Sequence, residues 1–335
     1  MTRKINNSYE LGQSNAPTDG GDMLKTRGDG TLVWEGVADT TYVPVSWYGD
    51  RAVGASGQGS HNEIQYLSIS SAGNGVDFGN LTETGHGCDA LSNGSRGIFA
   101  SLGSSCSNFF TINYVTIGTP SNATDFGDKN VGSLLGGCTS DGSRGVIAGG
   151  KMCGSNGNTD AMEYITIATL GNGTDFGNLT VSRANCRGAN DSTRGLTMGG
   201  VTYGPTYHDT IDYHTIQTTA NATDFGNLTQ TKKVGGATSN GTRAVYMGGY
   251  SSSQLIEIDY VTIQSTGNAS DFGDLTVARG YTTATSNGTG DRGMVFGGSV
   301  TATSTNYITI STTGNATSGG TLIDQSYNTG YTSGD

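Results

Sequence analysis

Residues 236–276 read GATSNGTRAVYMGGYSSSQLIEIDYVTIQSTGNASDFGDLT, and close variants of this stretch recur along most of the chain. Asn240-Gly241 separates two runs of β-forming residues, which is a strong hairpin signal because both residues tolerate positive φ. Tyr260 and Thr262 alternate with Val261 and Ile263, as is typical of a strand. The unit therefore predicts four short strands, called a to d in chain order: Gly235–Ser239, Arg243–Gly249, Asp259–Gln264 and Ser270–Thr276.

Three markers keep one period of about 49 residues along the chain. Strand c carries Tyr-x-[Thr/Ser]-Ile in six copies, which begin at Tyr66, Tyr114, Tyr164, Tyr213, Tyr260 and Tyr307. Strand b begins with Arg-[Gly/Ala] in six copies, at Arg51, Arg96, Arg144, Arg194, Arg243 and Arg292. Strand d carries Asp-Phe-Gly in five copies, which begin at Asp77, Asp125, Asp175, Asp224 and Asp271. The sixth copy is degenerate and reads Ser318-Gly319-Gly320.

Four antiparallel strands in each of six repeats predict an all-β fold, a six-bladed β-propeller. An open solenoid is the alternative, but neither end of the chain resembles a polar capping repeat. The C-terminal stretch Thr321–Asp335 aligns with Leu275–Thr289 and so corresponds to a strand a. We therefore predict a propeller over residues 42–335, in which this C-terminal strand completes the blade that begins at Arg51 and removes the open edge.

A separate segment, residues 1–41, precedes the repeats and carries none of their markers. Its Gly-Asp-Gly turn at 28–30 is flanked by apolar residues, so we expect a β-hairpin that is too short to build its own core. We interpret the segment as an attachment arm whose apolar residues bind a partner. These residues are Met23, Leu24, Leu32 and Trp34.

Composition and charge exclude several classes of protein. The chain has 335 residues, of which 56 are Gly, and a net charge of −11. Nucleic-acid binding requires clustered cations, so we expect no nucleic acid as a partner. No stretch approaches the ~18 apolar residues of a membrane span, and the first residues lead into no apolar run, so we predict neither a membrane span nor a secretory signal.

Five cysteines are present, and none forms a Cys-x-x-Cys pair: Cys88, Cys106, Cys138, Cys153 and Cys186. A disulfide framework usually has an even number of cysteines. We therefore expect buried free thiols rather than disulfides or metal ligands, in a chain made in a reducing cytoplasm.

The residues that could perform catalysis do not form a recognisable set. The four histidines lack zinc-ligand spacing, no nucleophile elbow is present, and the carboxylates outside the repeat phase are scattered. The Asp-Phe-Gly triplets resemble the kinase tripeptide in letters only, because no phosphate loop or catalytic loop accompanies them. We predict no enzyme activity, no catalytic residues, no cofactor and no bound metal, with calcium at the Asp/Asn-rich turns as the alternative.

The repeating arginines and aspartates allow two interpretations. We expect structural pairs, in which each strand-b arginine contacts an Asp-Phe-Gly aspartate of the same or the next blade. A cationic ring for an anionic ligand is the alternative.

The segment between strands b and c varies from 8 to 13 residues, whereas the a–b and c–d turns are nearly constant. In a propeller the b–c and d–a connections lie on one face, and insertions on one face usually mark a binding surface. Tyrosine and histidine on such loops suit recognition of a protein or a glycan. Our candidate binding residues are Lys151, Met152, Tyr203, Tyr207, His208 and Tyr250.

Strand b ends in Gly149-Gly150, Gly199-Gly200, Gly248-Gly249 and Gly297-Gly298, and a tyrosine follows in strand c, so the repeat resembles kelch over about residues 42–335. The tryptophan usual late in a kelch repeat is missing, since Trp34 and Trp47 both precede the first blade. The string GNASDFGDLT at 267–276 resembles repeats in virion proteins of tailed bacteriophages, marine ones especially. The segment 24–34 is similar to pieces near the start of phage fibre and appendage proteins.

The resemblance implies a non-enzymatic phage virion structural protein, assembled in the host cytoplasm and located on the virion. It would be a capsid decoration or an appendage (knob, tail fibre or fibre-associated) whose arm binds other virion proteins of the capsid or tail. The variable loops would then serve host attachment by contacting a host-surface glycan or protein. A cellular kelch-like adaptor and a glycan-active propeller enzyme are the alternatives.

Overall fold

The computed structural model describes the backbone of residues 22–26 and 32–36, and residues 49–55, 61–103, 105–154, 157–204, 206–299, 302–323 and 329–334. The chain divides into two compact units, Met1–Val45 and Ser46–Asp335. The smaller unit contains an antiparallel hairpin of β1 (Asp22–Thr26) and β2 (Leu32–Gly36). The boundary that we predicted between residues 41 and 42 lies outside the described residues.

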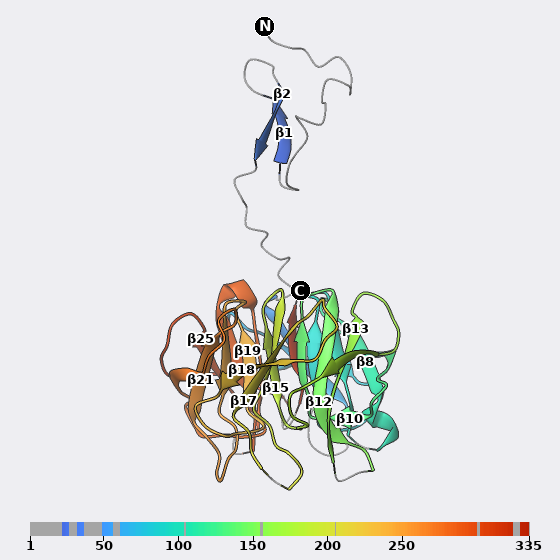
Figure 1. The fold of residues 1–335 in the computed structure, drawn as a ribbon, viewed down its shortest axis with the longest axis vertical. Coiled ribbons are helices and arrows are strands. Elements are labelled where there is room, and N and C mark those ends of the chain that lie inside the picture. The colour runs from blue at the N-terminus through green and yellow to red at the C-terminus, as the bar shows by residue number, and fades with distance from the viewer. Residues whose placement is uncertain are drawn as a thin grey trace. The chain divides into compact units, whose positions relative to one another are not determined.

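Six antiparallel sheets surround one axis in the larger unit, so the prediction of a six-bladed β-propeller is confirmed (Figure 1). Each sheet is a blade that runs outward from strand a at the axis to strand d. Blade 1 is β27 (Tyr331–Gly334), β3 (Arg51–Ala55), β4 (Glu63–Ser68) and β5 (Val76–Asn80), and blade 2 is β6 (Asp89–Ser92), β7 (Arg96–Ala100), β8 (Thr111–Thr116) and β9 (Thr124–Asp128). Blade 3 is β11 (Gly137–Ser140), β12 (Arg144–Met152), β13 (Asn158–Thr166) and β14 (Thr174–Asn178), with β10 (Ser133–Leu134) added beside β12.

The remaining blades follow the same plan. Blade 4 is β15 (Arg187–Asn190), β16 (Arg194–Met198), β17 (Thr210–Thr215) and β18 (Thr223–Asn227), and blade 5 is β19 (Gly236–Ser239), β20 (Arg243–Met247), β21 (Glu257–Thr262) and β22 (Ser270–Asp274). Blade 6 is β23 (Thr283–Ser286), β24 (Arg292–Phe296), β25 (Ser304–Thr309) and β26 (Thr317–Thr321). Two 3-10 turns, η2 (Ser107–Phe109) and η3 (Gly288–Gly290), complete the described elements. No helix in the described residues is long and apolar enough to cross a membrane.

The C-terminal strand closes the ring, as predicted. Strand β27 pairs antiparallel with β3, which places Tyr331 opposite Gly54. The ring of Tyr331 fills the space beside this glycine, where an added Cβ would lie 2.2 Å from the phenol carbon. The same ring stacks on Phe296 of blade 6, with centroids 4.1 Å apart and an interplanar angle of 5°. The last strand therefore joins blade 1 to blade 6 by pairing and by packing.

The Asp-Phe-Gly triplet builds the outer part of five blades. Its phenylalanine is buried and packs edge-to-face against the strand-c tyrosine of the same blade, at centroid distances of 5.9–6.3 Å. Its glycine has a φ between +141° and +143°, and the c–d turn of the next blade approaches it closely. At Gly226 an added Cβ would lie 2.4 Å from the carbonyl oxygen of Gly267. Its aspartate is exposed in all five copies: Asp77, Asp125, Asp175, Asp224 and Asp271.

The strand-b arginines connect neighbouring blades, but the partner that we predicted for them was wrong. Each guanidinium lies 4.1–4.8 Å from the ring centroid of the strand-c tyrosine in its own blade, a cation–π contact. Its Nη1 donates a hydrogen bond of 2.8–3.3 Å to the isoleucine carbonyl that follows strand c of the next blade. The bond from Arg292 to Ile69 completes the circle. Within the described residues these arginines therefore contact rings and carbonyl oxygens, and the Asp-Phe-Gly aspartates remain exposed.

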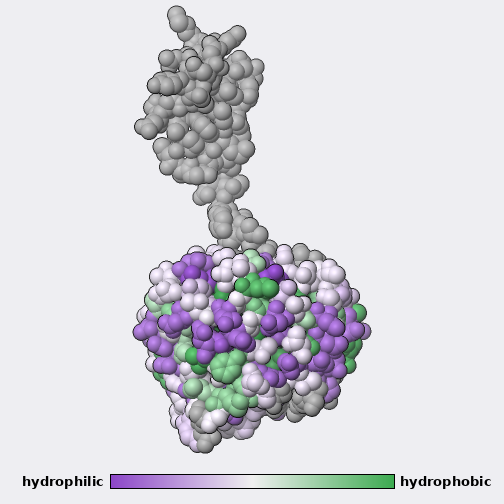
Figure 2. Space-filling model, turned by 90° about the vertical axis from the view of Figure 1, so that its right-hand side faces the viewer, coloured by the Kyte–Doolittle hydropathy of each residue, from purple (hydrophilic) through white to green (hydrophobic). Residues whose placement is uncertain are grey.

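The cysteines also depart from expectation, because Cys106 and Cys153 form a disulfide. Their separation of 47 residues is one repeat, so the bond joins the b–c loops of blades 2 and 3. The other three are free thiols, of which Cys88 and Cys186 are buried and Cys138 is half-buried. Figure 2 shows the side of the propeller near β8 and β10, where hydrophilic residues are mixed with small hydrophobic patches.

Candidate functional site

The two ends of the propeller are built differently. We call the end that carries the a–b and c–d turns the turn face; it lies at the C-terminal end of β27, near the C mark of Figure 1. We call the opposite end, which carries the b–c loops and the d–a connections, the loop face. Six blades repeat the same local contacts on the turn face, whereas the loop face differs from blade to blade.

One repeated contact of the c–d turns is a hydrogen bond that each of them accepts from strand d of the preceding blade. The backbone N–H of the last residue in strand d donates to an asparagine side chain in the neighbouring c–d turn, at 2.9–3.1 Å. All six blades accept one such bond. The acceptors are Asn74, Asn122, Asn172, Asn221, Asn268 and Asn315. These asparagines are therefore structural joints.

The loop face carries the residues that we selected from the sequence, and the structure brings only some of them together. Lys151 is exposed and Met152 half-buried at the end of β12, in a hairpin with β13. Tyr203 is 69% exposed on the b–c loop of blade 4. The rings of Tyr207 and Tyr250, from the b–c loops of blades 4 and 5, meet edge-to-face with centroids 6.3 Å apart.

Two residues that the sequence analysis missed complete this contact. Tyr281 packs against Tyr250 with centroids 6.4 Å apart. The ammonium of Lys233 lies 5.0 Å from the ring centroid of Tyr207 and 5.9 Å from that of Tyr250. All four side chains are half-buried. We call Tyr207, Tyr250, Tyr281 and Lys233 the tyrosine cluster.

Both missed residues lie in d–a connections, whereas our candidates were chosen from the b–c loops. A signal was nevertheless present, because Lys232-Lys233 is the only pair of adjacent lysines in the chain. The predicted neighbour His208 is half-buried, and burial lowers its pKa. Its Nε2 lies 3.4 Å from Thr202 Oγ1, within its own loop.

The backbone beneath the cluster is strained and interlocked. In blades 3 to 6, the residue two positions before strand a has a left-handed φ of 52–63°. These residues are Leu135, Asn185, Val234 and Tyr281. Non-glycine residues, and β-branched ones above all, rarely adopt this conformation. Hydrogen bonds link these positions from blade to blade, for example from Asn185 N–H to the Leu135 carbonyl at 2.6 Å and from Val234 N–H to the Asn185 carbonyl at 3.0 Å. This chain of bonds holds the loop face in a defined geometry.

Buried ion pairs support the same region. Lys232, which is fully buried beside Lys233, pairs with Asp259 of strand c at 2.8 Å. The equivalent Arg183 pairs with Asp212 at 2.8 Å, and both side chains are fully buried. Removing one member of such a pair leaves an uncompensated buried charge, which is strongly destabilising. A buried ion pair therefore fixes Lys232, which directly precedes Lys233 of the tyrosine cluster.

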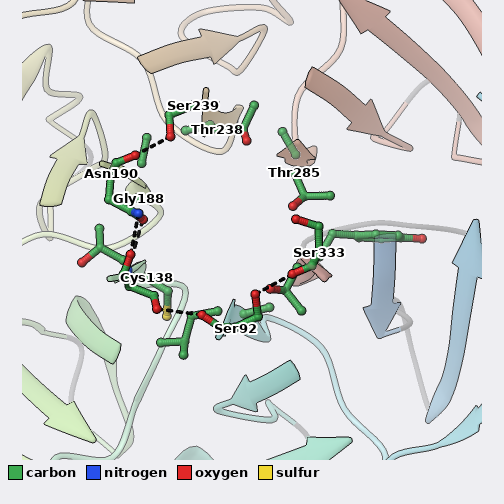
Figure 3. Close-up of a pocket in the computed structure, with 17 residues that line it drawn as sticks. Ser92, Cys138, Gly188, Asn190, Thr238, Ser239, Thr285 and Ser333 are labelled. Atoms are coloured by element: carbon green, nitrogen blue, oxygen red, sulfur yellow. Dashed lines mark hydrogen bonds between the residues drawn. The ribbon is translucent and has the colours of Figure 1, made fainter. Parts of the chain in front are cut away.

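The axis of the propeller forms a narrow channel lined by the inner strands (Figure 3). At the turn-face end, one polar side chain per blade donates a hydrogen bond to the carbonyl oxygen of the equivalent residue in the preceding blade. The six bonds form a closed ring. Its members are Ser92, Ser140, Asn190, Ser239, Ser286 and Ser333.

The loop-face end of the channel is charged instead. Arg187 is buried there and reaches across to blades 5 and 6, where it donates hydrogen bonds to the carbonyls of Gly235 and Thr282. Asp89 lines the same space and accepts the N–H of Gly136 at 2.9 Å. Burial raises the pKa of Asp89 to about 6, against the opposing attraction of Arg187 and Lys129. The channel is therefore lined by small side chains and occupied by an arginine at one end.

Two observations bear on the chemistry that the described residues offer. Among them, no group of three or more histidine, cysteine, aspartate or glutamate side chains is arranged to hold a metal ion. The tyrosine cluster, by contrast, offers ring faces, phenol hydroxyls and a cation on one surface. No protein-family model and no curated protein matches the chain.

Proposed function

We propose that this chain is a non-enzymatic virion structural protein of a tailed bacteriophage. It is a propeller appendage or decoration, anchored by its N-terminal arm to other virion proteins, and its loop face contacts the host surface. The observation that carries the proposal is the contrast between the two faces. The turn face repeats one set of bonds in six blades, whereas the loop face collects unlike residues into the tyrosine cluster.

The backbone register of the arm hairpin supports an anchoring role. Leu24 pairs with Trp34, and Leu32 lies two residues from Trp34, so the three positions share one face of the hairpin. Met23 pairs with Glu35 and lies on the other face. A two-stranded hairpin cannot bury an apolar face by itself. A partner protein that covers this face would gain roughly 1.5–3 kcal/mol for each large apolar side chain buried.

The disulfide supports display outside the cell. Cys106 and Cys153 join two b–c loops of the loop face, and Cys106 is exposed. Disulfides persist in oxidising surroundings and are rare in a reducing cytoplasm. A chain assembled in the cytoplasm and then released on a particle would form this bond where the loop face meets the medium.

The test is incorporation into particles. Purified virions are analysed by mass spectrometry after complementation with the full chain, or with a chain that begins at Tyr42 and so retains all six blades. We expect the full chain in the particles, and the shorter chain soluble, folded and absent from them. The full chain with Leu24→Ser and Trp34→Ser should also be absent, whereas Lys25→Ser, on the opposite hairpin face, should be incorporated. Normal incorporation of the shortened chain would move the anchor to a propeller face.

A further inference from the structure

We propose that the tyrosine cluster binds a carboxylated sugar, with the ring of the sugar against the tyrosines and its carboxylate on Lys233. This inference rests on the proposed function, since it names the class of ligand that the loop face takes. The site joins residues of blades 4 and 5 and of the connections that lead into blades 5 and 6.

The cation is the first part of the argument. Lys233 is half-buried and lies against two tyrosine rings, and no carboxylate in the described residues pairs with it. The whole chain has a net charge of −11, so acidic residues are plentiful elsewhere. A cation–π contact leaves the N–H donors of an ammonium available for an acceptor. Lys233 is thus held in place with its donors uncommitted to a carboxylate.

The tyrosines supply the second part. Each ring is half-buried, so part of each remains accessible to a ligand. The Tyr207 and Tyr250 rings stand at 89° to each other, and those of Tyr250 and Tyr281 at 46°. The rings therefore present faces and edges in different directions. The C–H face of a pyranose stacks on an aromatic face, and phenol hydroxyls exchange hydrogen bonds with sugar hydroxyls.

Rigidity is the third part, because a preorganised site loses less conformational entropy on binding. Lys233 and Tyr250 exchange both backbone hydrogen bonds, at 3.1 and 2.9 Å. Tyr281 is held at a φ of +62°, and the adjacent Lys232 is fixed by Asp259. The backbone of the cluster is therefore held by sheet-like bonds and a buried ion pair.

Other ligand classes fit less well. A nucleic acid needs several clustered cations, and the cluster has one. The core of a protein–protein interface is depleted in lysine, whereas Lys233 lies against two of the three rings of the cluster. A neutral sugar would leave Lys233 without an anionic partner.

The experiment uses the full chain on an array of bacterial-type oligosaccharides, in which each uronate- or sialate-containing member is printed beside its carboxyl-reduced counterpart. We expect the wild-type chain to bind carboxylated members, and reduction of the carboxyl group to weaken binding about tenfold or more. Lys233→Met should produce the same loss on the carboxylated members and little change on the reduced ones. Tyr250→Ala should weaken binding to the carboxylated and to the reduced members alike. Lys25→Met, in the hairpin of the smaller unit, is the matched control and should bind like wild type.

Melting temperatures are measured for all variants, and Lys233→Met provides the decisive comparison if Tyr250→Ala fails to fold. The inference is overturned if wild type binds no sugar on the array, or if Lys233→Met binds carboxylated members as well as wild type does. The proposed function fails separately, when virions lack the protein. A third outcome would be no binding to any sugar on the array, together with particles that carry the protein and lose adsorption when Lys233 is replaced by Met. This outcome would overturn the sugar ligand in favour of a protein ligand, and the proposed location on the virion would stand.

Discussion

The turn face and the loop face lie at opposite ends of the same strands, and they differ in how far their contacts repeat from blade to blade. On the turn face, asparagine joints, arginine–carbonyl bonds and the axial ring of polar side chains recur in every blade, and each set closes around the axis. On the loop face, equivalent positions hold unlike residues, such as Leu135, Asn185, Val234 and Tyr281 in one strained conformation. Closure of the ring is therefore distributed over repeated contacts of the turn face. Residues at equivalent positions of the loop face can then differ from blade to blade.

Removal of the closing strand should have the largest effect on the stability of the propeller. A chain that ends before Tyr331 lacks β27, so it exposes an edge of β3 and removes the ring that stacks on Phe296. We expect a loss comparable to the whole stability of a domain, about 5–15 kcal/mol, with aggregation. Size-exclusion chromatography and thermal unfolding measure this, and a chain lacking only Asp335 is the control. A monomeric shortened chain with cooperative unfolding would contradict the account.

Two glycine substitutions test how much the close contact between neighbouring blades contributes to stability. Gly226→Ala should cost about 2–4 kcal/mol, because φ is +143° and the new Cβ would meet the Gly267 carbonyl at 2.4 Å. Gly241→Ala is the matched control, since its φ is +84° but no atom lies within 4 Å of the new Cβ. Only the conformational cost, about 1 kcal/mol, should then remain. Urea unfolding compares them, and equal losses would show that blade–blade contact is not limiting.

Asp89 tests the charged end of the axial channel. Its pKa is about 6 in the folded chain because of burial, against about 3.9 in an unfolded one. A raised carboxyl pKa stabilises the fold fully below about pH 4, and this contribution is lost as the pH rises through about 6. Asp89→Asn should match wild type near pH 4 and exceed it by about 1–3 kcal/mol above pH 7. Urea unfolding from pH 4 to 8 gives the difference, and a gap that does not change with pH would contradict this origin.

Arg243 distinguishes structure from binding. Arg243→Ala removes the contact with the Tyr260 ring and the hydrogen bonds to the carbonyls of Ile310 and Ser311. We expect a loss of about 1–2 kcal/mol and unchanged ligand binding. Calorimetry and the glycan array measure the two effects. Retained stability with lost binding would instead favour the cationic ring.

The repeat made the fold predictable in detail, including the closing strand, because five or six copies of each marker fix both strand order and phase. The partner of each arginine was not predictable, since the acceptor is a backbone carbonyl that any residue supplies. The disulfide was missed because the cysteine count was odd, although a separation of 47 residues places both cysteines at the same point of neighbouring blades.

The loop face was predictable as a region but not as a site. Loop length identified Tyr207 and Tyr250, which do meet. Lys233 and Tyr281 lie in connections of regular length, and only the three-dimensional ring brings them beside the variable loops. The Arg183–Asp212 and Lys232–Asp259 pairs likewise join residues about 30 positions apart, since each cation lies in a d–a connection and its partner in strand c of the blade that follows.

A cryo-electron-microscopy reconstruction of the intact virion tests the central claim most directly. The account predicts six-bladed density on the outside of the particle, with the loop face directed outward and the residue 22–36 hairpin against another virion protein. Virions without such density, or with the tyrosine cluster buried against the shell, would contradict it.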